Sequence, residues 1–520
     1  MKNKRFNITG ACFPDEHYMV DISERLEKIR SMIIQGDYFI INRGRQYGKT
    51  TTLNALENYL DSEYLVISMD LQFFSAADLD SESGFVSAFA REMYRNSSLR
   101  ASLNNETKDT LKNLKTPGKD LVLADLFDVF CEICDGSEKA VVLMIDEIDN
   151  AAGTDIFIDF LSMIRGYYLR RNRLSFFRSV ILAGVRDIRN LKSRIRSDAD
   201  HQHNSPWNIA IDFNIDMSLS TGGIEGMLSE YKTDHGSDMD TRALANLIYD
   251  YTSGYPVLVS HICKLIDEEI HSWDESGVIA AVNRILSVND PLFESLNNKL
   301  EDYPEVKSSL YNILIRGDTI PYNPDNEAAN LLVRFGFVRV VDNTIVIANR
   351  IFETRLYNDM LTSSEVRETP ISKAGFFDKP VFVKNGMLDV ELIFERFIQH
   401  FHDIYGNEPE KFIEEDGRKC FLMYLRPIIN GVGNYYIEAH TRDNRRMDIV
   451  IDYLGKRYVI ELKIWRGQKY NEKGEKQILG YLETWHMKKG YMLTFSFSKN
   501  KETGIKTVEY GDKTIVEAIV

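Results

Sequence analysis

Apolar runs alternate with amphipathic segments along the first half of the chain. The runs are continuous, without polar residues at every second position, which is typical of strands buried on both faces of a parallel sheet. Segments between them have the spacing of amphipathic helices. The runs are DYFIINR, YLVISMDL, AVVLMIDEID and SVILAGVRD, and the helical segments include TTTLNALENYLD and FVSAFAREMYRN. This order predicts an α/β fold with a parallel sheet covered by helices.

The pattern changes twice further along the chain, which predicts five parts. Residues 1–221 form the α/β core, and 222–285 read as a helical lid. Two helices and a β-hairpin in 286–360 predict a winged helix. Residues 361–384 are polar, contain prolines and lack periodicity, so we expect a linker. In 385–520, a helical start leads to the order α-β-β-β-α-β, which predicts a compact second α/β domain.

The sequence IINRGRQYGKTTT, starting at Ile40, follows the first apolar run and opens a helix. It is close to the phosphate-binding pattern G-x-x-x-x-G-K-[ST], except that Arg43 stands where the first glycine belongs. Backbone N–H groups and the helix N-terminus can hold phosphates at such a position. We expect Lys49 to reach the β- and γ-phosphates and Thr50 to ligate Mg²⁺. The predicted nucleotide-binding residues of the loop are Arg43, Gly44, Arg45, Gln46, Tyr47, Gly48, Lys49, Thr50 and Thr51.

An acidic pair at the end of a later apolar run supports a nucleotide site at this loop. The apolar run AVVLM ends in Ile145, Asp146 and Glu147, the pattern of a Walker B strand. We expect Asp146 to hold Mg²⁺ and Glu147 to polarise the attacking water. Arg186 follows the next strand and is a candidate sensor of the γ-phosphate, with an ordinary surface arginine as the alternative.

Together, RGRQYGKTTTL, VLMIDEID, ILAGVRDI, SPWNIAIDFNIDMSL and TSGYPVLVSHIC resemble the bacterial AAA-ATPase-like proteins related to the STAND and origin-recognition ATPases. The resemblance covers residues 10–360 in outline. It implies that replacement of the first loop glycine is a family habit. It also implies that Arg186 closes the sensor strand and that Pro256, in the G-x-P turn of the lid, lies near the nucleotide.

The C-terminal part carries a second set of acidic and basic residues. In RRMDIVIDYLGKRYVIELKIW, Asp448 precedes Glu461 by 13 residues, and Lys463 follows two residues later. Glu461 and Lys463 share one face of a strand because side chains alternate with period two. A hairpin turn would bring Asp448 beside them. Carboxylates that hold Mg²⁺, with a lysine next to them, suit a metal-dependent nuclease.

This stretch, with its order of elements, resembles the PD-(D/E)XK nuclease superfamily over about residues 385–510. The resemblance implies that Asp448, Glu461 and Lys463 are catalytic and that Gln477, on the next helix, supports the site. Glu438 is a further candidate metal ligand. The alternative is a degenerate nuclease fold that is kept for binding.

Charge and composition add little to these motifs. The net charge is −15, but residues 431–520 hold 16 Lys/Arg and 12 Asp/Glu, a net of +4 that leaves −19 for the rest. This asymmetry favours a C-terminal module that faces a polyanion, with an ordinary solvated surface as the alternative. We find no apolar run long enough to span a membrane and no signal peptide, and the five cysteines do not suggest a disulfide framework. We therefore expect a cytoplasmic protein.

The sequence thus predicts an ATP-dependent switch coupled to a Mg²⁺-dependent endonuclease domain, with Mn²⁺ as an alternative metal there. The expected partner is nucleic acid, DNA rather than RNA, and we expect no membrane association. Homo-oligomers are compatible with the family, and a role in defence or in mobile elements would suit the fusion. One alternative is a nucleotide-regulated binding protein that grips nucleic acid or a protein partner without cutting. Another is a nuclease in which ATP is only a structural ligand.

Overall fold

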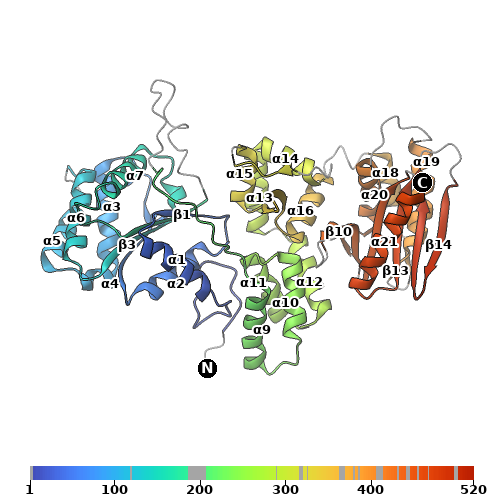
Figure 1. The fold of residues 1–520 in the computed structure, drawn as a ribbon, viewed down its shortest axis with the longest axis horizontal. Helices are drawn as coiled ribbons and strands as arrows, with labels where there is room; N and C mark the ends of the chain where they lie inside the picture. The colour runs from blue at the N-terminus through green and yellow to red at the C-terminus, as the bar shows by residue number, and fades with distance from the viewer. Residues whose placement is uncertain are drawn as a thin grey trace, which may run out of the picture. The chain divides into compact units, whose positions relative to one another are not determined.

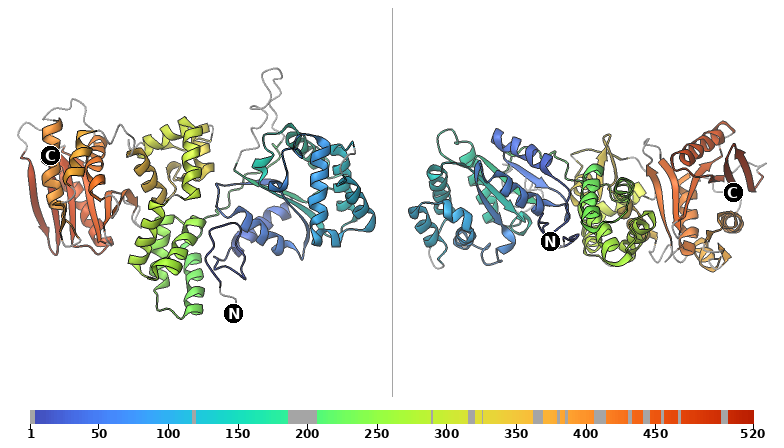
Figure 2. Two further views of the ribbon diagram at one scale, coloured as in Figure 1. Left: turned by 180° about the vertical axis from the view of Figure 1, so that it is seen from behind. Right: turned by 90° about the horizontal axis from the view of Figure 1, so that it is seen from below.

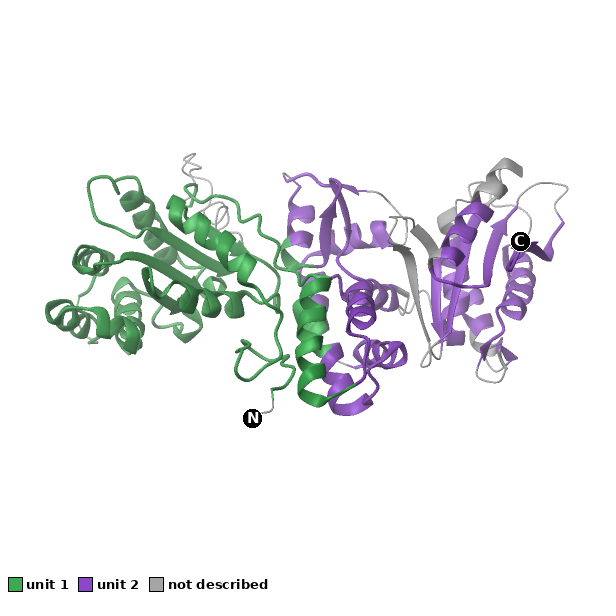
Figure 3. Ribbon diagram, turned by 60° about the horizontal axis from the view of Figure 1, so that its bottom comes forward, with its two compact units in different colours: residues 1–237, 254–261, 334–336 green, residues 238–253, 262–333, 337–520 purple. Residues whose placement is uncertain are grey.

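The computed structural model (Figure 1) describes all of the chain except fifteen segments. These are residues 1–3, 117–119, 186–206, 289, 315–319, 325, 362–368, 379–380, 385–386, 406–413, 430–432, 441–445, 454–455, 466–467 and 497–501. The chain divides into two compact units (Figure 3). Unit 1 contains residues 1–237, 254–261 and 334–336, and unit 2 contains residues 238–253, 262–333 and 337–520. None of the described helices is long and apolar enough to cross a membrane.

A four-stranded parallel sheet forms the centre of unit 1, as the apolar runs predict. Its order is β1-β4-β3-β2. Ile211 adds a parallel bridge beside β1 at Phe39. The strands are β1 Phe39–Asn42, β2 Tyr64–Asp70, β3 Ala140–Asp146 and β4 Ser179–Gly184.

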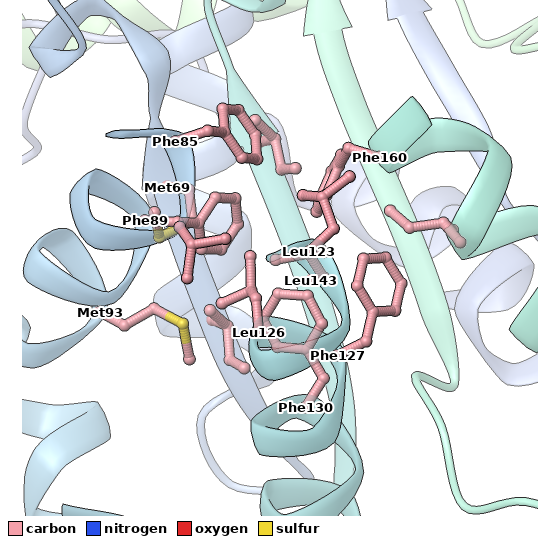
Figure 4. Close-up of a cluster of buried hydrophobic side chains, with 14 of the residues drawn as sticks. Met69, Phe85, Phe89, Met93, Leu123, Leu126, Phe127, Phe130, Leu143 and Phe160 are labelled. Atoms are coloured by element: carbon pink, nitrogen blue, oxygen red, sulfur yellow. The ribbon is translucent and has the colours of Figure 1, made fainter. Parts of the chain in front are cut away.

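Helices cover both faces of this sheet (Figure 2), which is why its strands are apolar throughout. Along β3, Val142 and Met144 pack on one face, and Leu143 and Ile145 pack on the other. The first face is covered by α1 Ser23–Gln35 and α2 Lys49–Leu60. The second carries a phenylalanine-rich core (Figure 4) from α3 Glu82–Arg95, α6 Leu123–Gly136 and α7 Asp155–Tyr168. Unit 1 also contains the described helices α4 Ser97–Ser102, α5 Asn105–Leu114 and α9 Thr221–His235.

The predicted lid and winged helix form a helical region with a small sheet. Its three strands have the order β5-β7-β6, and β6 and β7 form the predicted hairpin. The strands are β5 Ile320–Pro321, β6 Val338–Val341 and β7 Thr344–Ile347. The helices are α10 Thr241–Thr252, α11 Pro256–Leu265, α12 Glu275–Ser287, α13 Pro291–Asp302, α14 Pro304–Leu314, α15 Glu327–Phe335 and α16 Arg350–Leu361. Two pieces of this region, 254–261 and 334–336, belong to unit 1.

The C-terminal part of unit 2 contains a six-stranded mixed sheet of order β10-β11-β12-β13-β15-β14. The antiparallel meander β10-β11-β12 continues through helix α21 into β13, which pairs parallel with β12. This order agrees with the predicted β-β-β-α-β sequence. The strands are β10 Gly433–His440, β11 Arg446–Tyr453, β12 Lys456–Ile464, β13 Lys489–Phe495, β14 Gly504–Tyr510 and β15 Lys513–Ile519.

Both faces of this sheet are covered too. On one face, Phe394 and Phe397 of α19 Val390–Tyr405 pack against Tyr491 and Phe495 of β13. On the other, α21 Gln468–Thr484 packs against Met492. Helix α20 Glu414–Ile429 also contacts the sheet.

Two features of the C-terminal part differ from the sequence expectation. The segment expected to be a linker contains helix α18 Pro370–Asp378, which packs closely on α20, with Ile371 fully buried. The short pair β8 Val383–Lys384 and β9 Met387–Leu388 follows it. The hairpin β14–β15 extends the sheet beyond the last strand that the sequence predicts.

Candidate functional site

The loop between β1 and α2 closes around the amine of Lys49. Lys49 is buried, and its Nζ donates to the carbonyl oxygens of Arg43 at 3.0 Å and Gly44 at 3.1 Å. Two residues, Gln46 (φ 58°) and Gly48 (φ 79°), have left-handed backbone conformations, and Gly48 caps α2. Burial lowers the pKa of Lys49, and the nearby carboxylates of Glu147 and Asp146 oppose this shift. The ammonium is therefore held by two backbone carbonyl oxygens of the loop that precedes α2.

Arg43 points away from the centre of the loop. Its guanidinium donates to the carbonyl oxygens of Asn42 at 2.9 Å, Ile215 at 3.2 Å and Phe213 at 3.3 Å, and lies 5.6 Å from the centre of the Phe213 ring. Its backbone N–H continues the sheet pairing by donating to Gly184. Burial lowers the pKa of Arg43. These contacts fix the start of the loop where the usual pattern has a glycine, while phosphate contact by Arg43 stays a prediction.

The loop has a glycine at position 44, one residue after the usual glycine position, and it has no room for a side chain there. A Cβ atom there would lie 2.6 Å from the carbonyl oxygen of Phe335 and 3.0 Å from its carbon. Gly336 follows with φ 76°, and a Cβ atom on it would lie 3.6 Å from the Tyr255 ring and 3.8 Å from the Tyr47 ring. Backbone from the end of α15 thus packs directly on the loop between β1 and α2, the candidate phosphate loop, and this close approach requires glycine at position 44.

The end of β3 brings two carboxylates to the loop. Thr50 Oγ1 donates to Asp146 Oδ2 at 2.6 Å, and the N–H of Glu147 donates to Asp146 Oδ1 at 2.8 Å. Glu147 itself has φ 51°, which turns the chain sharply at the sheet edge. Burial, and then the charge of Asp146, raise the pKa of the Glu147 carboxyl. The structure therefore brings Lys49, Thr50, Asp146 and Glu147 together, as the sequence predicts.

Oxygen donors at this edge suit a hard cation. A threonine hydroxyl and a carboxylate in direct contact are the ligand types that Mg²⁺ prefers. In the described part of the chain, no group of three or more His, Cys, Asp or Glu side chains is arranged to hold a metal ion alone. Mg²⁺ commonly takes one or two protein ligands together with substrate phosphates.

The other predicted loop residues have varied surroundings. Thr51 accepts a hydrogen bond from the backbone of Cys12 at 3.1 Å. Arg45 and Gln46 are exposed. Pro256 begins α11, but the contact with the loop comes from its neighbour Tyr255. Arg186 lies outside the described residues.

Tyr255 is a site residue that the sequence pattern alone does not identify. It is buried, its hydroxyl donates to the Arg45 carbonyl oxygen at 2.8 Å, and its ring meets Tyr47 edge-on at 4.6 Å. Burial raises its pKa well above the ordinary tyrosine range. The Gly254-Tyr255-Pro256 motif is visible in the sequence, but only the structure shows that the tyrosine makes the contact.

In the C-terminal sheet, strand register aligns the predicted acidic residues. The pairing of β11 with β12 runs from Tyr453–Lys456 to Ile449–Ile460, and Asp448 and Glu461 each lie one residue beyond its last pair. Glu438 lies between Ile437 and Ala439, which pair with Ile449 and Met447, and is therefore opposite Asp448. The side chains of Glu438 and Asp448 lie outside the described part of the structure. Extension of the β11–β12 register by one pair predicts one shared face for the three residues.

Glu461 and Lys463 form a buried ion pair, with 2.8 Å between Lys463 Nζ and Glu461 Oε1. Helix α21 lies over this face, because a Cβ atom on Gly474 would approach the Lys463 side chain to 3.3 Å. Gln477 is three residues further on and is half-buried. It therefore shares the Gly474 side of the helix.

Comparison with known proteins finds no matching family model and no matching curated protein. Among solved structures, the chain is similar to a Walker-type ATPase of Pyrococcus abyssi at 13% identity, with a TM-score of 0.48, covering 68% of this chain and 99% of that one. It is similar to the ORC2 protein of Aeropyrum pernix, in ADPNP–ADP complexes, at 13% identity and a TM-score of 0.38, covering 65% and 94%.

The RuvB Holliday junction branch migration motor of Thermotoga maritima gives 13% identity and a TM-score of 0.31, covering 64% of this chain and 93% of that one. At these identities and TM-scores the similarity carries no argument about function. What the β1–α2 loop and the C-terminal sheet can do chemically follows from their own geometry.

Proposed function

We propose that the chain binds and hydrolyses ATP at the loop between β1 and α2. The observation that carries this proposal is the convergence of Lys49, Thr50 and Asp146, with Thr50 and Asp146 only 2.6 Å apart, at the N-terminus of a helix. Backbone N–H groups at a helix N-terminus favour phosphate, and the buried ammonium supplies the positive charge. The position is the carboxyl end of a parallel sheet, where α/β proteins bind ligands.

Each residue has a role in this proposal. Lys49 exchanges its bonds with the loop carbonyls for bonds with the β- and γ-phosphates. Thr50 and Asp146 hold Mg²⁺, which, when bound, neutralises charge on the phosphates. Glu147 accepts a hydrogen bond from the attacking water, and its half-buried carboxyl is oriented by the turn at the end of β3.

The test is nucleotide binding and turnover by the full chain. Lys49→Ala should lose affinity for both ATP and ADP. Glu147→Gln should keep that affinity but lower the hydrolysis rate by about 100-fold or more, the range expected for a lost general base. Equal hydrolysis by wild type and Glu147→Gln would remove Glu147 from its role, and lack of nucleotide binding by wild type would refute the proposal.

A second function is proposed for the C-terminal sheet, namely Mg²⁺-dependent cleavage of nucleic acid, with DNA as the preferred substrate and Mn²⁺ as an alternative metal. The supporting observation is the buried Glu461–Lys463 pair, aligned with Asp448 and Glu438 by strand register. A buried pair of this kind is weak evidence for stability, since its desolvation cost offsets much of the Coulombic gain.

In this second function, the carboxylates of Asp448 and Glu461 hold the metal, with Glu438 as a further ligand. Lys463 orients the attacking water, and Gln477 supports the site from α21. Water adds to phosphorus, one P–O ester bond breaks, and the leaving oxygen takes up a proton. We further propose a cytoplasmic location, which the composition favours. Self-assembly and a role in defence or mobile elements rest on the family resemblance alone.

A nuclease panel tests this function. Single- and double-stranded DNA and RNA are incubated with the full chain and Mg²⁺ or Mn²⁺, with ATP, ADP or no nucleotide. Wild type should cut at least one substrate, and Glu461→Ala and Lys463→Ala should each abolish cutting. If wild type leaves every substrate intact but still retards one in a binding assay, the C-terminal sheet is a binding module instead.

A further inference from the structure

A cluster of buried polar residues in unit 2 joins the helical region to the C-terminal sheet. Tyr251, near the end of α10, donates from its hydroxyl to Asp452 Oδ2 on β11 at 2.7 Å. Tyr251 is fully buried, and Asp452 is 3% exposed. The two residues are 201 positions apart in the chain. Buried polar groups are costly without partners, so this bond specifies one arrangement of α10 against β11.

Further residues enclose the same carboxylate. Arg457, directly opposite Asp452 on β12, donates from Nε to Asp452 Oδ1 at 3.1 Å. The Arg457 guanidinium lies 4.3 Å from the centre of the Trp485 ring, at the end of α21. Arg350 of α16 pairs with Asp250 at 2.8 Å, and its guanidinium lies 5.9 Å from the centres of the Trp485 and Tyr251 rings. Five elements of unit 2 thus meet around Asp452.

The cluster sits on the strands that carry the candidate nuclease residues. Asp452 and Asp448 are four residues apart on β11, and Arg457 and Glu461 are four apart on β12. Because strand side chains alternate, Arg457 and Glu461 lie on one face of the sheet. A shift of the Asp452 end of this hairpin would therefore move the row that contains Glu461.

The other end of the connection is the phosphate loop. Four residues after Tyr251, Tyr255 donates to the Arg45 carbonyl. The turn between the two tyrosines is tight, with Ser253 at φ 48° and Gly254 at φ 74°. A Cβ atom on Gly254 would lie 2.1 Å from the Leu219 carbonyl oxygen, and Leu219 donates to the Gly254 carbonyl at 2.8 Å. The chain passes from unit 2 to unit 1 at this turn.

We propose that the Tyr251–Asp452 hydrogen bond is a coupling link, through which nucleotide binding at the phosphate loop changes the β11–β12 hairpin. Nucleotide binding shifts the loop and, with it, Tyr255, which is hydrogen-bonded to Arg45. Because the Ser253–Gly254 turn joins Tyr255 to the end of α10, Tyr251 shifts too, and its hydrogen bond moves Asp452. This inference rests on the proposed nucleotide binding but not on nuclease activity.

Hydrogen–deuterium exchange of the full chain tests the link. It compares no nucleotide, ADP and a non-hydrolysable ATP analogue in wild type, Tyr251→Phe and Asp452→Asn. In wild type, nucleotide should protect peptides of the loop and change the uptake of β11 and β12. Either substitution should speed exchange in β11 and β12 by about tenfold, as expected for loss of a buried hydrogen bond to a charged group, and should remove their response to nucleotide.

A matched control comes from the same helix. Tyr249→Phe also removes a tyrosine hydroxyl from α10, and it should keep the wild-type response. If Tyr251→Phe retains the full nucleotide response in β11 and β12 while the loop is protected, the link is wrong and the cluster only holds α10 against the sheet. The same conclusion follows if wild type shows loop protection but no change in β11 and β12. If the loop itself is not protected, the proposed nucleotide binding fails, and the link falls with it.

Discussion

At the scale of single residues, Arg43 shows how a loop can depart from its pattern and keep its geometry. Its guanidinium binds three backbone carbonyl oxygens, so it anchors the strand-to-loop transition. We predict that Arg43→Ala lowers the free energy of unfolding by about 1–2 kcal/mol, the value of lost hydrogen bonds to a partly buried charge. If Arg43 only shapes the loop, Arg43→Ala should also lower the affinities for ADP and for an ATP analogue by similar factors.

Isothermal titration calorimetry with ADP and with the ATP analogue measures the two affinities. Arg43→Lys is the matched variant, because lysine keeps the charge but cannot reproduce the fork of donors. It should therefore resemble Arg43→Ala. A much larger loss for the ATP analogue than for ADP would show that Arg43 contacts the γ-phosphate instead.

The Glu147 carboxyl should make the thermal stability of the protein depend on pH. Burial raises the pKa of its carboxyl above the unfolded value, so the ionised form is disfavoured in the folded protein. Stability is therefore lost as pH rises from the unfolded pKa through the raised pKa of the folded state. Glu147→Gln removes this ionisation and should raise the Tm of the nucleotide-free protein at pH 7.

The difference in Tm should shrink as pH falls below the raised pKa, because the wild-type carboxyl is then neutral as well. Thermal scans of both proteins between about pH 4 and pH 8 measure the two curves. A constant difference across this range would mean that the substitution acts through packing and not through charge.

At the scale of elements, the contact between the end of α15 and the phosphate loop depends on Gly44. Any side chain there meets the backbone of Phe335, which cannot rotate away. We predict that Gly44→Ala lowers the free energy of unfolding by about 1–3 kcal/mol, the typical cost of overpacking, and weakens nucleotide binding. Urea denaturation of the full chain measures the first effect.

Gly226→Ala is the control for this substitution. Gly226 lies within α9, and a Cβ atom there would meet nothing within 4 Å. Alanine should therefore stabilise the helix by up to about 1 kcal/mol. If Gly44→Ala is as harmless as Gly226→Ala, the segment at Phe335 does not pack on the loop in solution.

The elements themselves can be predicted from the sequence to different degrees. Strands β1 to β4 are predictable because both faces of their sheet are covered, which leaves uninterrupted apolar runs such as 141–145. Helix α18 is not, since its few apolar residues, Ile371 among them, form no clear stripe in a proline-flanked segment. The close approach of Phe335 to Gly44 involves backbone atoms, and the Tyr251–Asp452 pair spans 201 positions. Neither leaves a periodic signal in the sequence.

At the scale of the whole molecule, the charge distribution favours one surface for the proposed binding of nucleic acid. The region 286–360, which the sequence predicts to be a winged helix, holds seven Lys/Arg and eleven Asp/Glu, a net of −4, so it is a poor surface for phosphates. Residues 431–520 have a net of +4. We therefore expect nucleic acid to contact the C-terminal sheet and not the winged helix.

This expectation yields a prediction about salt. If the C-terminal region neutralises about three or four phosphates, affinity should fall by about one to two orders of magnitude between roughly 50 and 200 mM salt, because bound counterions are released. Fluorescence anisotropy with the Glu461→Gln variant measures binding without cleavage. Charge-reversing Arg339→Glu on β6 should leave the affinity unchanged, since it lies in the winged helix. A large loss with Arg339→Glu would place the nucleic acid on the winged helix, and the C-terminal sheet would then act on a substrate that another surface holds.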